Sequence, residues 1–141
     1  MTGDKIENFN KALKIPTTLA PWLSVRNSLK AVSFYTAAFG ATVVYRLEAP
    51  DGSLVARLSV DGAEFWLSDE SPDYGNFSPE TLGGGSVRMI LTVTDPDAFF
   101  AQALQAGASE VFPVVEDYGW RLGKLIDPFG HTWEIGRQLN S

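Results

Sequence analysis

Asp127-Pro128-Phe129-Gly130-His131-Thr132-Trp133-Glu134-Ile135 is the stretch that decides the fold, because it closes the second copy of a pattern that the chain carries twice. Placing Val25 over Val93 gives an offset of 93 − 25 = 68 residues, and at this offset Trp66 lies over Glu134. An internal repeat near this period indicates one supersecondary unit that buries its apolar face against its copy. We therefore expect equivalent positions of the two copies to converge on a shared internal site.

Composition narrows the functional class. The chain has 141 residues, enough for one domain with a sizeable core, and its 45% hydrophobic and 20% charged content is ordinary for a soluble protein. A net charge of −6 argues against non-specific binding to nucleic acid, which needs a basic surface. The absence of cysteine excludes disulfides, thiolate nucleophiles and Cys-ligated zinc. No signal peptide and no apolar run of about 20 residues is present, so we expect a cytoplasmic protein with no membrane partner.

The order of elements is the same in both copies. Caps, glycines and alternating apolar residues predict a strand, a helix and three more strands in each. The predicted ranges are 17–25, 27–39, 42–47, 54–60 and 63–69 for the first copy, and 87–93, 96–106, 110–115, 120–126 and 131–136 for the second. The fold class is therefore α+β, with tandem βαβββ modules forming a curved sheet around a cleft.

The domain boundaries follow from this pattern. Residues 17–137 form a single domain made of modules 17–69 and 86–137, joined by a Gly- and Pro-rich linker at 70–85. Residues 1–16 form an N-terminal extension, in which helical spacing at 4–14 indicates either a surface appendage or a docking helix.

Strand alternation selects the candidate site. In the fourth strand Phe65 and Leu67 face the helix, which leaves Trp66 on the opposite face. The same reasoning in the other strands places five residues on the helix-free faces of the two modules, and we expect them to line one concavity: Ala20, Trp22, Trp66, Arg88 and Glu134.

The tandem βαβββ pattern, the segment Val25-Arg26-Asn27 … Phe34-Tyr35 … Phe39-Gly40-Ala41 and the closing stretch from Asp127 to Ile135 resemble the vicinal oxygen chelate superfamily. This superfamily includes glyoxalase I, extradiol dioxygenases, fosfomycin-resistance enzymes and bleomycin-resistance proteins. The chain is most similar to the PhnB-like subgroup of glyoxalase/bleomycin-resistance proteins, over about residues 17–137. The resemblance implies two modules whose sheets curve around a cleft that binds a small molecule, usually in a homodimer.

The resemblance also implies a divalent metal ion, held by His and Glu side chains at four strand positions. Ala20, Trp66, Arg88 and Glu134 occupy those positions here. Only Glu134 is a competent ligand, and Arg88 brings a permanent positive charge. Because a stable site needs three or more protein ligands, we expect no metal and no other cofactor.

Several roles stay open at this point. Glu134 is either a general base or the ion-pair partner of Arg88. Trp22 and Trp66 either stack on a flat or cationic ligand or fill the core. Tyr118 and Trp120 belong either to the rim of the cleft or to a solvated loop. His131 is expected to be structural.

Two classes of function are compatible with these residues. The first is a small-molecule-binding protein with a degenerate metal site, which sequesters an antibiotic-like or aromatic ligand. The second is a lyase or other enzyme that acts on a small oxygenated substrate with Glu134 as base. Whether the protein is an enzyme stays open.

Overall fold

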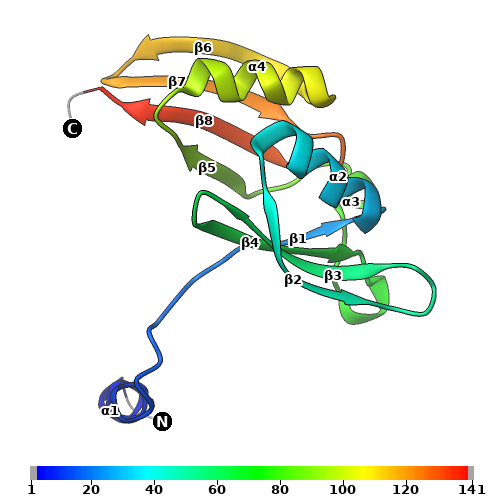
Figure 1. Ribbon diagram of the computed structural model, residues 1–141, viewed down its shortest axis with the longest axis vertical. Helices are drawn as coiled ribbons and strands as arrows, with labels where there is room; N and C mark the ends of the chain where they lie inside the picture. Colours follow the sequence, from blue (N-terminus) through cyan, green and yellow to red (C-terminus); the bar gives the residue numbers. More distant parts are fainter. Residues whose placement is uncertain (1–2, 140–141) are drawn as a thin grey trace.

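The computed structural model describes residues 3–139, except for the side chains of residues 9–12, and it contains two βαβββ modules (Figure 1). The first module consists of β1 (Trp22–Val25), α2 (Ser28–Phe39), β2 (Thr42–Glu48), β3 (Leu54–Val60) and β4 (Ala63–Asp69). The second consists of β5 (Arg88–Thr92), α4 (Pro96–Ala106), β6 (Ser109–Asp117), β7 (Trp120–Ile126) and β8 (Thr132–Gln138). The predicted tandem modules are confirmed.

The helix boundaries follow from local chemistry. The side chain of Asn27 accepts a hydrogen bond from the amide of Lys30, which caps the start of α2, and Asp95 caps α4 in the same way. Gly40 ends α2 in the left-handed conformation at φ 66°, which glycine adopts without the clash of a Cβ. These caps fix where each chain segment returns from helix to sheet.

The register of the two sheets reproduces the sequence repeat. Their strand orders are β1-β4-β3-β2 and β5-β8-β7-β6, and in each sheet the first strand pairs with the last in parallel. Trp22 lies opposite Trp66 in one sheet and Ile90 lies opposite Glu134 in the other. Both members of the second pair lie 68 residues after those of the first, since 90 − 22 and 134 − 66 are both 68. The offset found in the sequence is therefore a structural equivalence.

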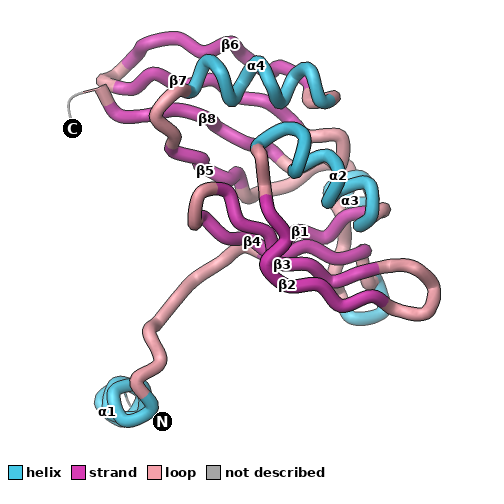
Figure 2. The backbone as a smooth tube through the Cα atoms, viewed as in Figure 1, coloured by secondary structure: helices cyan, strands magenta, loops and turns pink. Residues whose placement is uncertain are grey.

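One core is shared by both modules. Helix α2 packs on the first sheet, helix α4 packs on the second, and the two helices contact each other (Figure 2). Gln102 on α4 donates a hydrogen bond to the carbonyl of Ala37 on α2. Phe65 of the first sheet and Trp133 of the second are 5.5 Å apart between ring centroids, with both rings buried. Because the helix-side faces of both sheets point into this core, their helix-free faces lie on the outside of the protein.

Asp127, the first residue of the closing stretch, is a buried hydrogen-bond centre. Its Oδ1 accepts hydrogen bonds from the amides of Phe129 and His131, at 2.9 and 3.0 Å. Its Oδ2 accepts from the indole of Trp133 at 2.9 Å and from the hydroxyl of Tyr35 in the first module. The stretch that decided the fold in sequence therefore ties the two modules together.

Three details differ from the sequence prediction. The first strand begins at Trp22 and not at Thr17, because Pro16 and Pro21 have no amide hydrogen to donate to a ladder. Val87, the first residue of the predicted strand 87–93, precedes β5 and is exposed. The predicted linker contains two short helical turns, η1 (Pro72–Tyr74) and α3 (Pro79–Leu82).

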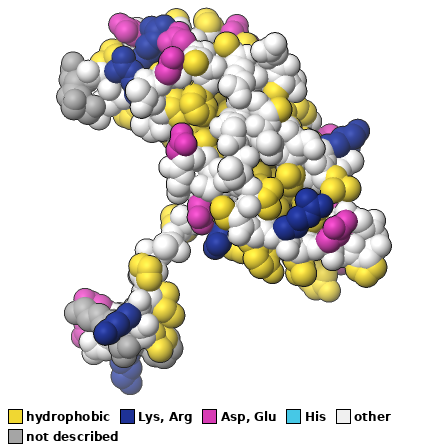
Figure 3. Space-filling model, viewed as in Figure 1, with side chains coloured by type: hydrophobic (Ala, Val, Ile, Leu, Met, Phe, Trp, Pro, Cys, Tyr) yellow, Lys and Arg dark blue, Asp and Glu magenta, His cyan; other side chains and the backbone are white. Residues whose placement is uncertain are grey.

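The N-terminal helix α1 (Gly3–Leu13) stands apart from the modules at the end of an extended segment (Figure 1). Ile6, Leu13 and Ile15 are exposed, and hydrophobic side chains gather along one side of this arm (Figure 3). Of the two alternatives for residues 4–14, this arrangement favours the surface appendage. None of the helices among residues 3–139 combines the length and apolar character that crossing a membrane requires.

Candidate functional site

A row of aromatic side chains crosses the helix-free face of the first sheet. Trp22 on β1 and Trp66 on β4 are stacked, with ring centroids 5.1 Å apart and planes 6° from parallel. Tyr45 on β2 continues the row, 5.6 Å from Trp66 between ring centroids. The prediction that Trp66 lies opposite the helix is confirmed, and neither tryptophan belongs to the buried core.

The two sides of Trp66 are covered by neighbours. Arg57 on β3 places its guanidinium carbon 5.3 Å from the centroid of the Trp66 ring, in cation–π geometry. Because β1 and β3 flank β4, Trp22 and Arg57 lie on opposite sides of Trp66. Trp66 is therefore enclosed by its neighbours. Trp22 lies on the edge strand and is 53% exposed, so it is the ring that is free to contact a ligand.

Ser68 fixes the orientation of Trp22. The indole Nε1 of Trp22 donates a 2.8 Å hydrogen bond to the hydroxyl of Ser68, two residues beyond Trp66 on β4. With this bond on one edge and the Trp66 ring on one face, Trp22 presents its remaining face in a defined direction.

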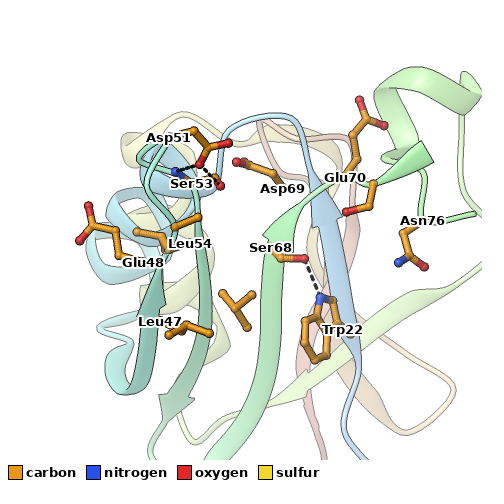
Figure 4. A pocket seen from close by; sticks show the side chains of 13 residues that line it. Trp22, Leu47, Glu48, Asp51, Ser53, Leu54, Ser68, Asp69, Glu70 and Asn76 are labelled. Carbon is orange, nitrogen blue, oxygen red and sulfur yellow. Dashed lines mark hydrogen bonds between the residues drawn. The ribbon is translucent and has the colours of Figure 1, made fainter. Parts of the chain in front are cut away.

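A cavity of about 560 Å³ opens beside Trp22, at the end of β4 and beneath the hairpin that joins β2 to β3 (Figure 4). Trp22, Leu47 and Val55 supply its apolar surface. Polar side chains from the hairpin and from the segment after β4 form its rim, including four carboxylates: Glu48, Asp51, Asp69 and Glu70. This volume falls within the range typical of small-molecule sites.

The rim carboxylates are held by local hydrogen bonds. The amide of Ser78 and the hydroxyl of Thr81, and more weakly Arg26, lower the pKa of Glu70 below its usual value. Hydrogen bonds from the side chain and amide of Ser53 lower the pKa of Asp51. These two carboxyl groups are therefore charged at neutral pH.

The carboxylates at the rim of the cavity were not predicted from the sequence. Pro50-Asp51-Gly52 has the composition of a turn, but turn residues do not indicate which way a hairpin leans over a sheet. The one available signal was the concentration of acidic residues in the two segments that follow β2 and β4.

On the helix-free face of the second sheet, Glu134 occupies the position equivalent to Trp66, and Ile90 the position equivalent to Trp22. Arg88 and Glu134 form an ion pair, with side chains that are 62% and 13% exposed. Lys124 lies opposite Glu134 in the register, and Phe112 lies opposite Lys124, as Tyr45 lies opposite Arg57 in the first sheet. The sequence left two roles open for Glu134, general base or ion-pair partner of Arg88, and the structure shows the ion pair.

The structure does not bring all the predicted site residues together. Trp22 and Trp66 lie on the outer face of one sheet, and Arg88 and Glu134 on that of the other. Tyr118 is 96% exposed at the tip of the β6–β7 hairpin. Trp120 lines a separate crevice of about 760 Å³.

The remaining sequence candidates have other positions. Ala20 precedes β1 and is exposed. The Nε2 atom of His131 lies 2.9 Å from the carbonyl oxygen of Ser24, so this histidine joins the modules, as expected of a structural residue.

The residues present do not fit a divalent metal ion. In the described part of the chain, no three His, Cys, Asp or Glu side chains converge in a group that could hold one. At the strand positions that the family resemblance singles out, Trp66 is stacked between its neighbours and Glu134 is paired with Arg88. An arginine beside the sole carboxylate opposes the binding of a cation.

Sequence comparisons give one consistent result. The sequence model of the Glyoxalase/Bleomycin resistance protein/Dioxygenase superfamily matches residues 15–135. The uncharacterized protein Mb0911c of Mycobacterium bovis is 40% identical over 134 residues, covering 91% of this chain and 88% of that protein. The uncharacterized protein At5g48480 of Arabidopsis thaliana is 35% identical over 113 residues, covering 73% of this chain and 67% of that protein.

Solved structures share the fold. The X-ray structure of the Arabidopsis At5g48480 product aligns with a TM-score of 0.64 and 31% identity, over 86% of this chain and 97% of that one. The fosfomycin resistance protein FosX of Listeria monocytogenes, solved with Mn(II) and sulfate, aligns with a TM-score of 0.65 over 87% of this chain and 93% of that one. At 13% identity, the second likeness concerns the fold alone.

Proposed function

Because the chain belongs to the Glyoxalase/Bleomycin resistance protein/Dioxygenase superfamily, we propose that it binds a small, flat, antibiotic-like or aromatic ligand against Trp22 without a metal ion. The observation that carries this proposal is the stacked and hydrogen-bonded Trp22 at the wall of a cavity of about 560 Å³. A ring already held in place loses little conformational entropy when a ligand stacks on it. Aromatic stacking then supplies both contact area and a preferred orientation.

Ligand binding is a better-supported function than catalysis with Glu134 as the general base. A general base must have a lone pair within reach of the proton that it removes. The Glu134 carboxylate is instead paired with Arg88 and lies across the strands from Lys124. The ion pair with Arg88 therefore keeps the carboxylate engaged, which supports a structural or electrostatic role.

The proposal includes a homodimer. Strands β1 and β5 are sheet edges whose outer sides have no partner strand in the described part of the chain. Apolar side chains are exposed on or beside β5, including Val87 and Ile90. Unpaired apolar edges of this kind need covering. A second copy could cover them and set the Arg88–Glu134 face of one protomer opposite the Trp22 face of the other.

The binding proposal is tested with planar probes of equal size. Titrations of 1-methylquinolinium, 2-methylquinoline and quinoline-2-carboxylate, followed by calorimetry, should detect binding of at least one probe. Trp22→Ala should weaken that binding by about tenfold or more, as expected when a stacking ring worth about 1.5 kcal/mol is lost. Trp120→Ala is the matched control, because Trp120 also begins a strand but lines the other crevice. No binding of any probe, or equal losses in both variants, would contradict the proposal.

The dimer is tested separately by light scattering at micromolar concentration. We expect twice the mass of the chain for the wild type and a monomer mass for Ile90→Lys, which puts a charge on the β5 edge. The control Val111→Lys places the same charge on β6, at the far edge of the sheet, and should stay dimeric. A monomeric wild type would contradict this part of the proposal and leave the binding test unaffected.

A further inference from the structure

We infer that the ligand of the Trp22 cavity carries a positive charge, and that the site selects planar aromatic cations or amines over neutral and anionic analogues of the same size. This inference rests on the proposed function, and it goes further by naming the chemical class of the ligand. It combines three observations: the charge of the cavity rim, the hydrogen bonds that its carboxylates make, and the free face of Trp22.

The rim of the cavity is acidic. Four of the 13 residues that line it are carboxylates, and none is lysine or arginine (Figure 4). Arginines outside the lining partly offset two of them, because Arg46 lies 3.7 Å from Glu48 and Arg26 lies 3.7 Å from Glu70. The remaining two, Asp51 and Asp69, have no ion-pair partner within the described residues. The cavity therefore keeps a negative charge.

The hydrogen bonds of Asp51 and Asp69 leave acceptors available. The Oδ1 atom of Asp69 accepts a 2.7 Å bond from the amide of Ser28, at the start of α2. The Oδ1 atom of Asp51 accepts two bonds from Ser53, at 3.0 and 2.6 Å. Among the amides and side chains that the structure describes, neither Oδ2 atom receives a hydrogen bond. Each aspartate is thus oriented by one oxygen and has the other available.

The ring of Trp22 also favours a cationic ligand, independently of the carboxylates of the rim. The face of an aromatic ring carries negative electrostatic potential, and tryptophan attracts cations most strongly among the aromatic side chains. Arg57 occupies the far side of Trp66, so it does not occupy the Trp22 face. A flat cation stacked on Trp22 would have its charge near both the ring and the carboxylates of the rim. An anion would meet repulsion from both, and a neutral ring would gain only the stacking.

The test compares the three quinoline probes at about pH 8, where 1-methylquinolinium is a cation, 2-methylquinoline is neutral and quinoline-2-carboxylate is an anion. We expect the cation to bind about tenfold or more tightly than the neutral probe, as two uncompensated charges near a ligand imply. The anion should bind more weakly than the neutral probe. Raising the salt concentration from about 20 to 200 mM should weaken only the cation, because screening acts on charges.

Two double variants isolate the aspartates. Asp51→Asn/Asp69→Asn keeps both Oδ1 acceptors and removes two charges, and it should reduce the affinity for 1-methylquinolinium about tenfold while leaving 2-methylquinoline within about twofold. Glu116→Gln/Asp117→Asn changes the net charge equally on the β6–β7 hairpin and should leave both probes within about twofold. Equal or tighter binding of the neutral or anionic probe, or equal losses in the two variants, would overturn only the inference about the charge of the ligand and leave the proposed function standing. Failure of every probe to bind would overturn the proposed function with it.

Discussion

The hydroxyl of Tyr35, in the helix of the first module, donates a hydrogen bond to Oδ2 of Asp127 in the second module. Both residues are buried, and Asp127 accepts three further hydrogen bonds from its own module. A buried carboxylate is stable only when it is well satisfied, and here one of its donors comes from the other half of the chain. This pair therefore couples the packing of the two modules.

Asp127→Ala should be strongly destabilising. The change leaves four donors without their acceptor, including those of Tyr35 and Trp133 in the core. An orphaned buried donor costs about 1–3 kcal/mol, so we expect a loss of at least about 3 kcal/mol in the free energy of unfolding. Urea unfolding followed by circular dichroism measures it. Asp117→Ala, on an exposed hairpin, is the control and should stay within about 0.5 kcal/mol. Equal effects of the two changes would refute the assignment.

Tyr35 should make stability fall at alkaline pH. Burial, and then the negative charge of Asp127, raises the pKa of Tyr35 well above its usual value. The unfolded chain then releases the phenolic proton first, so the stabilisation is complete below about pH 10 and is lost as the pH rises from there toward the folded pKa. Unfolding free energies measured between about pH 8 and 11 should decline more steeply for the wild type than for Tyr35→Phe. Parallel pH profiles would show that Tyr35 does not carry the effect.

The Arg88–Glu134 pair should respond asymmetrically to mutation. Arg88→Met strands a largely buried carboxylate, whereas Glu134→Gln releases an arginine that is already 62% exposed. We expect a loss of about 1–2 kcal/mol for the first and of less than about 1 kcal/mol for the second. The double variant should recover part of the loss, with a coupling of at least about 0.5 kcal/mol. A smaller coupling in the double-mutant cycle would mean that the pair contributes nothing measurable.

Gly136→Ala should destabilise the second sheet. A Cβ at this position of β8 would collide with the carbonyl oxygen of Arg121 and would lie 2.6 Å from the Leu122 side chain. Overpacking of this kind costs about 1–3 kcal/mol. Gly85→Ala is the matched control, because an added Cβ there meets nothing within 4 Å. Thermal unfolding should give a lower melting temperature for Gly136→Ala than for Gly85→Ala. Equal losses in the two variants would contradict a steric requirement at Gly136.

Removal of residues 1–16 should leave the stability of the remaining chain unchanged to within about 0.5 kcal/mol, because α1 stands apart from both modules. This deletion tests the proposed domain boundary at residue 17. A large loss of stability would show that the extension belongs to the domain.

The parts of the structure that depend on periodicity could be predicted from sequence. Alternation along β4 placed Trp66 opposite the helix, and the 68-residue offset put Trp66 and Glu134 at equivalent positions. These features are either local or repeated along the chain, so they can be predicted from a single sequence. The ion pair of Arg88 with Glu134 was one of the two roles that the same argument left open for Glu134.

The parts that depend on packing between modules could not be predicted. The repeat defines each module but not how α2 and α4 meet, so the outward direction of the helix-free faces was not foreseen. The partner of Asp127 lies 92 residues away, with no periodic signal to connect them. The acidic rim of the cavity depends on the lean of the β2–β3 hairpin, which turn residues do not encode.

The hydrogen bond between Tyr35 and Asp127 also affects how the chain is synthesised. At typical ribosome rates of about 5–20 residues per second, the 92 residues between these partners take roughly 5–20 s to be added. During that delay the apolar side of the first module, with Tyr35 and Phe65, has no second module to pack against. The nascent first half would then be the form most in need of protection from aggregation, and a fragment that ends between β4 and Asp127 should aggregate more readily than the full chain.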